Sequence, residues 1–149
     1  MSHAHDAAQA AEAARDSLLR NGESFIAETV ASHESMIDLV RRACEAGCYV
    51  HLIVIAVPEE YSVQRVRMRV AAGGHDVPEE KIRSRWQRLW DNVVAMIELA
   101  DSAEVFDNSG PGPATIATFV AGEIVGTPRW PDWTPAALTA RWPHANDPQ

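Results

Sequence analysis

The run from Tyr49 to Val57 constrains the fold more than any other part of the chain, because it is almost continuously apolar and partly β-branched. Such runs are typical of strands that are buried on both faces, as in parallel sheets covered by helices. Its longest uninterrupted apolar stretch, Leu52 to Val57, is far too short to cross a membrane as a helix. The run therefore predicts a buried strand in a layered fold.

Helix and strand patterns alternate around this run, and the alternation predicts an α/β layer fold with a mostly parallel sheet. Alanine-rich stretches and apolar residues at helical spacing predict helices at residues 4–20, 32–46, 62–72 and 78–97. Short apolar runs predict strands at Phe25–Glu28 and Glu104–Asp107, and a small C-terminal β-hairpin over Ala117–Val125 that turns at Ala121-Gly122.

The size and charge of the chain limit the kinds of protein to which it can belong. Its 149 residues suit one domain, and its net charge of −8 disfavours binding to nucleic acid or to an anionic membrane, which needs a basic face. The N-terminus shows no basic segment followed by an apolar one, as a secretory signal would. Cys44 and Cys48 fit core packing and make no disulfide framework, so we expect a reduced, cytoplasmic protein.

A basic helix, a glycine-hinged loop and a second helix rich in arginine follow one another between Arg65 and Arg88. Gly73-Gly74 breaks the first helix, and Pro78 fits the first turn of the second. A mobile loop flanked by arginines suits the covering of a transferring phosphate, because guanidinium groups stabilise its charge. The spacing alone also fits the solvated faces of two helices. The glycine hinge, which has no use within a helix, favours the phosphate lid.

Glu28 and His75 each allow two interpretations. Glu28 ends a predicted strand, where ligands collect in open α/β sheets, but it also fits a partner for the start of the helix near Ser32. His75 fits either a loop donor to phosphate or a surface residue. It has no second ligand at a metal spacing, so no metal site is predicted.

Three blocks of sequence, in this order, resemble the zeta toxin family of P-loop kinases. The first is Asn21–Thr29, which is similar to a G-E-S-F-x-x-E-T strand. The second is Gly73–Pro78 with the helix that follows it, and the third is Val105–Ser109. The resemblance implies a P-loop-kinase-like layered fold over residues 1–125, with a lid at about 65–88, followed by a Pro/Trp-rich tail.

Members of this family are ATP-dependent phosphotransferases, and zeta toxins phosphorylate the sugar of UDP-N-acetylglucosamine. The resemblance therefore implies ATP and Mg²⁺ as cofactors, a nucleotide-sugar or similar small hydroxyl compound as substrate, and a toxin–antitoxin setting. It also implies three sets of site residues: Arg83, Arg85 and Arg88 at the transferring phosphate, Glu28 and Thr29 at the substrate, and His75 and Asn108 at the nucleotide.

One part of the family pattern is missing, because the sequence contains no G-x-x-x-x-G-K-[ST] loop. In the strand order common among P-loop kinases, the strand before that loop lies between the strands predicted here at Phe25–Glu28 and Tyr49–Val57. The fold is therefore expected to be N-terminally truncated. We expect a rearranged sheet, a strand donated by a partner chain, or a fragment that folds poorly, since each unpaired buried backbone group costs about 1–3 kcal/mol.

Two functions remain open at this level. The chain is either a zeta-toxin-type phosphotransferase that is inactive alone, because the phosphate-binding loop and catalytic base are absent, or a non-catalytic kinase remnant. The first needs a partner chain that supplies the missing strand, whereas the second predicts a self-associated homo-oligomer. The second acts as an anion-binding, oligomerising or regulatory module. Residues 126–149 alternate prolines and tryptophans, which predicts a tail that is either docked through its tryptophans or loosely ordered.

Overall fold

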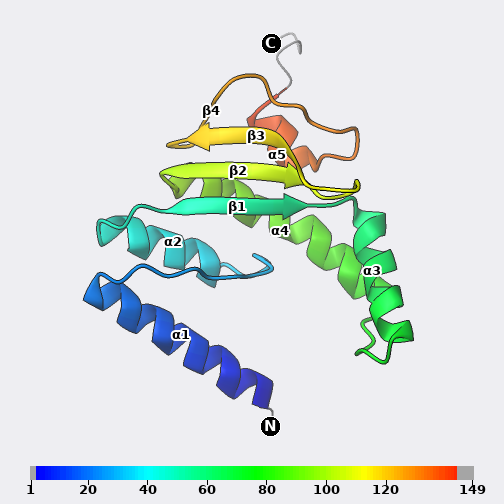
Figure 1. Ribbon diagram of the computed structural model, residues 1–149, viewed down its shortest axis with the longest axis horizontal. Coiled ribbons are helices and arrows are strands. Elements are labelled where there is room, and N and C mark those ends of the chain that lie inside the picture. The colour runs from blue at the N-terminus through cyan, green and yellow to red at the C-terminus, as the bar shows by residue number, and fades with distance from the viewer. Residues whose placement is uncertain (1–2, 144–149) are drawn as a thin grey trace.

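The structure is a computed structural model that describes residues 3–143. Within these residues the chain forms five helices and four strands (Figure 1). Their order is α1 (His3–Asn21), α2 (Ser35–Glu45), β1 (His51–Ala56), α3 (Glu59–Ala71), α4 (Glu79–Leu99), β2 (Ser102–Asp107), β3 (Ala114–Val120), β4 (Glu123–Ile124) and α5 (Ala136–Arg141). Across this part of the chain, no helix combines the length and hydrophobicity that a membrane crossing requires.

The strands form one mixed sheet in the order β1-β2-β3-β4. Strand β1 pairs with β2 in parallel, whereas β2 with β3 and β3 with β4 are antiparallel. The expectation of a mostly parallel sheet is therefore corrected to a mixed sheet with one parallel pair. Because β1 is an edge strand, one side of its backbone has no strand beside it within the described residues.

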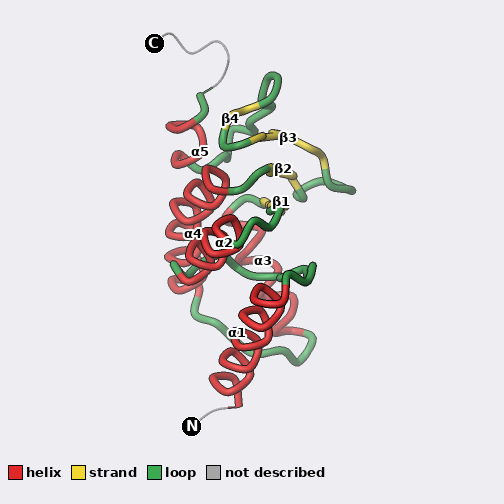
Figure 2. Tube along the Cα trace, turned by 90° about the vertical axis from the view of Figure 1, so that its left-hand side faces the viewer, coloured by secondary structure: helices red, strands yellow, loops and turns green. Residues whose placement is uncertain are grey.

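Helices cover one face of this sheet only. Figure 2 shows α2, α4 and α5 on one side of the strands, and no helix over the other side within the described residues. The covered face holds the core, in which Trp90, Met96 and Ile97 of α4 pack with Val54 and Phe119 of the strands. On the bare face Ile53, Ile55 and Val120 are each more than half exposed.

The apolar spacing of α4 explains why this helix is the centre of the core. Trp90, Val93, Met96 and Ile97 recur at helical intervals and are all buried. The prediction of a long helix from Pro78 is therefore confirmed. Strands β1, β2 and the hairpin β3–β4 also lie where the sequence predicts them, including the turn at Ala121-Gly122.

The strand predicted at Phe25–Glu28 is wrong, because these residues lie in an irregular segment outside the sheet. An extended segment becomes a strand only when a neighbour accepts and donates its backbone hydrogen bonds. No strand of the described chain takes that place. The helix predicted from residue 32 begins instead at Ser35, and Glu34 at its cap makes no side-chain capping bond.

The described part of the tail packs on the core instead of hanging free. Trp130 and Trp142 are buried, and Trp142 contacts Phe119 with ring centroids 4.7 Å apart. The Trp142 indole donates to the Gly122 carbonyl (3.1 Å), and the Trp130 indole donates to the carbonyl of Trp142 (2.9 Å). Of the two tail arrangements that the sequence allows, residues 126–143 adopt the docked one.

Candidate functional site

Helices α3 and α4 form a hairpin that extends past one end of the sheet (Figure 1). The turn between them depends on its two glycines. Gly73 has a φ of 88°, and a Cβ on Gly74 would lie 2.7 Å from both the carbonyl oxygen and the Cγ of Arg69. Neither position accepts a larger residue without strain or displacement of backbone. The predicted glycine break between two basic helices is therefore confirmed.

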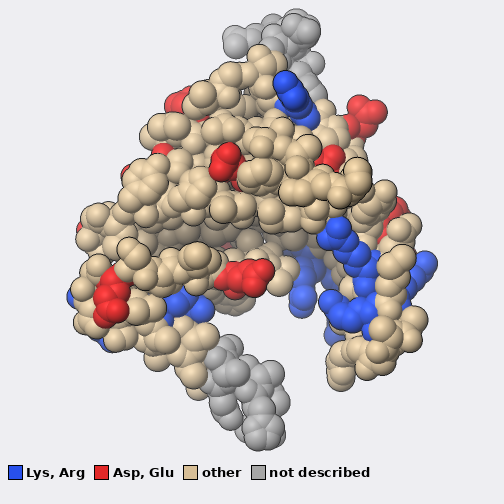
Figure 3. All heavy atoms as spheres, viewed as in Figure 1, with Lys and Arg blue, Asp and Glu red and all other residues tan. Residues whose placement is uncertain are grey.

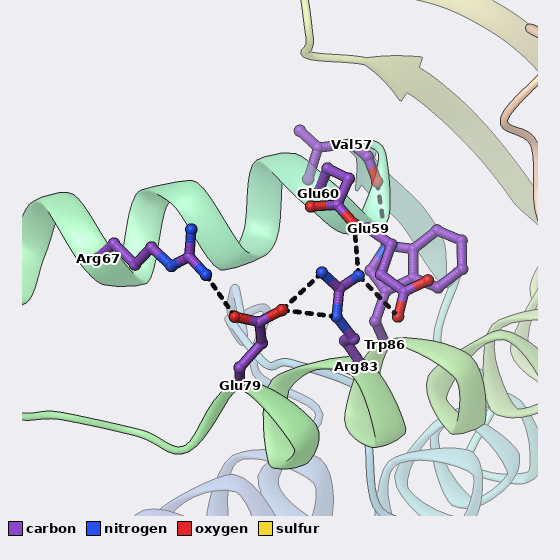
Figure 4. A network of polar contacts seen from close by, with 7 residues as sticks. All are labelled: Val57, Glu59, Glu60, Arg67, Glu79, Arg83 and Trp86. Atoms are coloured by element: carbon purple, nitrogen blue, oxygen red, sulfur yellow. Dashed lines mark hydrogen bonds and ion pairs between the residues drawn. The ribbon is translucent and has the colours of Figure 1, made fainter.

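A polar network joins the two helices near the sheet (Figure 4). The Arg83 guanidinium of α4 contacts Glu60 of α3 at 2.6 Å and Glu79 of its own helix at 2.7 Å. It also lies 3.6 Å from Glu59, and Arg67 of α3 completes the network by binding Glu79. Arg83 is thus the hub of a cluster in which three carboxylates surround one guanidinium.

The ionisation of these groups reflects their mutual contacts. Hydrogen bonds with Glu60 and then Glu79 raise the pKa of Arg83 above its ordinary value. The bonds from Arg83 lower the pKa of Glu60, and bonds from Arg83 and Arg67 lower the pKa of Glu79. These shifts favour the charged forms of Arg83, Glu60 and Glu79 and therefore favour the network at neutral pH.

Two hydrogen bonds fix the hairpin at the carboxyl ends of the parallel strands. The Trp86 indole donates to the Val57 carbonyl just after β1 (3.0 Å). Arg65 of α3 donates to the Asn108 carbonyl just after β2 (3.1 Å). Ligands of open α/β sheets collect outside the carboxyl ends of parallel strands. The basic hairpin therefore stands at the end of the sheet where a ligand site is expected.

Cationic side chains concentrate on this hairpin, although the chain as a whole is acidic. Seven of the thirteen basic residues lie in it: Arg65, Arg67, Arg69, Lys81, Arg83, Arg85 and Arg88. Figure 3 shows lysine and arginine side chains gathered on the hairpin side of the opening below the sheet. The charge contrast predicts attraction of a small anion to this side of the molecule.

Lys81, Arg85 and Arg88 differ from Arg83 in their contacts. A hollow of about 400 Å³ on α4 is lined by these three residues together with Glu80 and Ser84. Arg88 donates through Nε to the Ser84 carbonyl of its own helix (3.2 Å), and none of the three forms an ion pair within the described residues. Their charges face solvent in one hollow, which suits the oxygens of a phosphate group.

The other predicted site residues lie apart from this hollow. Glu28 is exposed in the irregular segment, and the Thr29 hydroxyl accepts the backbone N–H of Ala31 (3.1 Å). His75 is exposed in the glycine turn. That turn belongs to the hairpin, and Asn108 contacts the hairpin through its carbonyl bond with Arg65. The structure therefore joins Asn108 to Arg65 of the hairpin, and its described part records no hydrogen bond or ion pair of Asn108 or Glu28 with Arg83, Arg85 or Arg88.

Sequence reasoning missed the carboxylates that hold Arg83. Glu79 lies four residues before Arg83 on the same helix, a spacing that signals an ion pair. Glu59 and Glu60 lie on another helix, more than twenty positions away, and no local pattern links them to Arg83. Trp86 lies within the predicted helix, but its indole bond to Val57 depends on where the sheet lies and no local pattern predicts it.

The donor chemistry of the hairpin fits phosphate better than it fits a metal ion. Guanidinium and ammonium groups bind phosphate oxygens directly. Magnesium needs carboxylate, hydroxyl or phosphate oxygens that are free to coordinate it. Among the described residues no group of three or more histidine, cysteine, aspartate or glutamate side chains is arranged to hold a metal ion. The nearby carboxylates Glu60 and Glu79 are already bound to Arg83.

Comparison with known proteins gives one family and one relative. The sequence model of the family described as Zeta toxin matches residues 2–111, which is most of the chain. An uncharacterized protein of Haemophilus influenzae is 35% identical over 63 residues, covering 42% of this chain and 45% of that protein. The chain thus spans less than half the length of this curated relative. No solved structure was found to match.

Proposed function

Because the chain belongs to the zeta toxin family, whose members are kinase-like phosphotransferases, we propose that its hairpin α3–α4 binds the phosphates of a nucleotide or nucleotide-sugar. The observation that carries this proposal is the hollow on α4, where Lys81, Arg85 and Arg88 gather without ion-pair partners in the described chain. A phosphate in this hollow would receive charge-assisted hydrogen bonds from three side chains of one rigid helix.

The arginines divide into two roles in this proposal. Arg85 and Arg88 face the hollow and would stabilise the negative charge of a transferring phosphoryl group. Arg83 is held by three carboxylates, so it would act as a positioning residue that keeps α3 against α4. ATP with Mg²⁺ would supply the phosphoryl group. The residues described here would bind and orient it without themselves holding the ion.

Substrate residues and domain limits belong to the same proposal. Glu28 and Thr29 would contact a small hydroxyl compound such as UDP-N-acetylglucosamine, and His75 and Asn108 would lie by the nucleotide. The irregular segment that carries Glu28 would then have to approach the hairpin when ligand binds. The kinase-like domain, with a P-loop-kinase-like fold, would extend over residues 1–125, with the tail as a separate packing element.

Titration of the purified chain tests the binding step. We expect heat of binding with ATP·Mg²⁺ or with UDP-N-acetylglucosamine in isothermal calorimetry. The double substitution Arg85→Ala with Arg88→Ala should weaken that binding at least tenfold, because charge-assisted hydrogen bonds contribute about 1.5–3 kcal/mol each. Arg129→Ala removes one exposed arginine of the tail and serves as the control. Equal affinities for the double variant and the native chain would place the ligand elsewhere.

A further inference from the structure

The outer edge of β1 carries backbone groups that no strand of the described chain satisfies. The Ser102 N–H donates to the Val50 carbonyl, and the Asn108 N–H donates to the Ala56 carbonyl. In a parallel ladder the N–H and C=O of one residue point to the same side, so even-numbered residues of β1 face β2. The N–H and C=O groups of His51, Ile53 and Ile55 therefore face away from the sheet.

This edge also lacks the features that usually protect an edge strand. Strand β1 contains no proline, no lysine and no bulge, and Ile53 and Ile55 are each more than half exposed. Exposed, regular, apolar edges are templates for the addition of another strand.

A second unpaired segment lies opposite this edge. Residues 24–30 run in the same direction as β1 (Figure 1), and none of their backbone groups has a backbone partner in the described chain. Two of their apolar side chains face solvent, Ile26 fully and Val30 by 58%. The segment thus has the backbone and the composition of a strand that lacks its neighbour.

A cavity of about 450 Å³ separates the two segments at the amino-terminal half of β1. Phe25 and Ala27 line one wall, Leu52 lines the other, and Leu39, Val40 and Met96 of the helices line its base. The walls are thus mainly apolar, and unpaired backbone stands on both sides. An extended polypeptide offers apolar side chains to the walls and backbone hydrogen bonds to both segments. A small apolar ligand leaves the backbone groups unpaired.

We infer that this cavity is a slot for one β-strand, supplied by another polypeptide as an extended segment with apolar side chains on its inward face. The strand pairs with the outer edge of β1 and with residues 24–30, and it makes the sheet continuous. A folded second copy is a poorer occupant, because each copy carries residues 24–30 beside its own β1. Two β1 edges cannot meet until both segments move.

Hydrogen exchange with a synthetic peptide tests the slot. The probe carries the sequence of His51–Val57 between two pairs of lysines, because this sequence forms a strand here and the lysines keep it soluble. We expect the amides of Ile53 and Ile55 to exchange at least tenfold more slowly with peptide than without it. The Val54 amide, which already faces β2, should change little and is the internal control.

Two controls separate strand pairing from apolar adsorption. A peptide of the same sequence and charge, N-methylated at alternate residues, should give no protection, because it cannot pair along an edge. On the protein side, Ile53→Pro should abolish the effect and Ile53→Val should keep it, since proline is tolerated where the N–H faces away from the sheet. If Ile53→Pro does not fold, the methylated peptide still distinguishes strand pairing from apolar adsorption.

Three outcomes would overturn the inference. They are equal protection by the methylated peptide, no protection at millimolar peptide, and amides of Ile53 and Ile55 that are already protected in a dimer without peptide. The hairpin arginines take no part in the slot. A chain that binds the peptide but no nucleotide therefore upholds this inference and refutes only the proposed function, and the reverse result does the opposite.

Discussion

Among single residues, Ala121 and Gly122 show most directly how side chains decide backbone shape. Both have positive φ, 49° and 77°, as a tight turn between antiparallel strands requires. A Cβ on Gly122 would lie 3.2 Å from the Cα of Glu98, so the α4 backbone would have to shift by a few tenths of an ångström to admit a side chain there. Ala121 is exposed and has room, but alanine disfavours this conformation.

Substitutions in this turn should have opposite effects. Ala121→Asn should raise the free energy of unfolding by up to about 1 kcal/mol, because asparagine tolerates positive φ. Gly122→Ala should lower it by about 1–3 kcal/mol through contact with the α4 backbone and strain. Urea denaturation measures both. A neutral Gly122→Ala would mean that the hairpin does not pack on α4 as described.

Arg83 should stabilise the chain only while its carboxylate partners are charged. The pKa values of Glu60 and Glu79 are lowered in the fold, so their contribution is present above the unfolded carboxyl pKa of about 4.3. It is lost as the pH falls through the lowered values. We expect Arg83→Ala to lower the melting temperature between pH 5 and 8, and the difference from the native chain to vanish in stronger acid.

Arg85→Ala is the matched control for this experiment, because Arg85 has no ion-pair partner within the described residues. Its melting temperature should follow that of the native chain at every pH. A pH-independent loss in Arg83→Ala would show that Arg83 acts through packing of its aliphatic stem and not through its charge.

At the level of helices and strands, prediction succeeded where the pattern is local. The apolar spacing of α4, the apolar run of β1 and the glycine turn after α3 each lie within one segment, and each predicted its element. The strand expected at Phe25–Glu28 failed because strand formation depends on a neighbour that no local pattern contains. Helix α5 escaped notice because it is only six residues long and follows Pro135.

Within the candidate site, too, local patterns were predictable from the sequence and contacts between distant segments were not. The basic hairpin was predicted from its sequence, and the structure joins it to Asn108 through Arg65, while the roles of the site residues stay a prediction. The partners Glu59 and Glu60 could not be found, because their contact with Arg83 depends on the packing of α3 against α4. The packing of helix α1 also depends on contacts between helices. None of its described side chains is buried, and Arg42 of α2 binds its Asp16 at 2.7 Å.

Loss of Trp142 should undock the tail. This side chain is buried, packs against the Phe119 ring in a tilted arrangement and donates to the Gly122 carbonyl. Trp142→Ala should therefore cost about 3–5 kcal/mol of unfolding free energy in urea denaturation. Trp133→Ala, at a half-buried position, should cost less. Similar small losses for both variants would contradict the docked arrangement of residues 126–143.

Across the whole molecule, stability should be unevenly distributed. Helix α3 buries one side chain, Val63, whereas α4 buries four and lies against both the sheet and α2. Segments with few buried contacts open at lower free energy than the core. The hairpin can therefore loosen without unfolding of the sheet, as a phosphate lid requires.

Native-state hydrogen exchange should resolve this difference. Amides of α3 should exchange through a local opening, and amides in the second half of α4 only through global unfolding. Saturating ATP·Mg²⁺ should slow exchange in α3 if the lid closes on the ligand. Uniform protection of both helices in the free chain would mean that the hairpin is part of the rigid core.

The two margins of the sheet are not equivalent. At one margin β4 is only two residues long, carries Glu123, and is followed by the docked tail. At the other, β1 offers six regular residues. A molecule with one sheet edge open to pairing can add only one strand. Addition of a strand from another chain therefore stops after a single event and gives a defined one-to-one complex instead of a growing fibril.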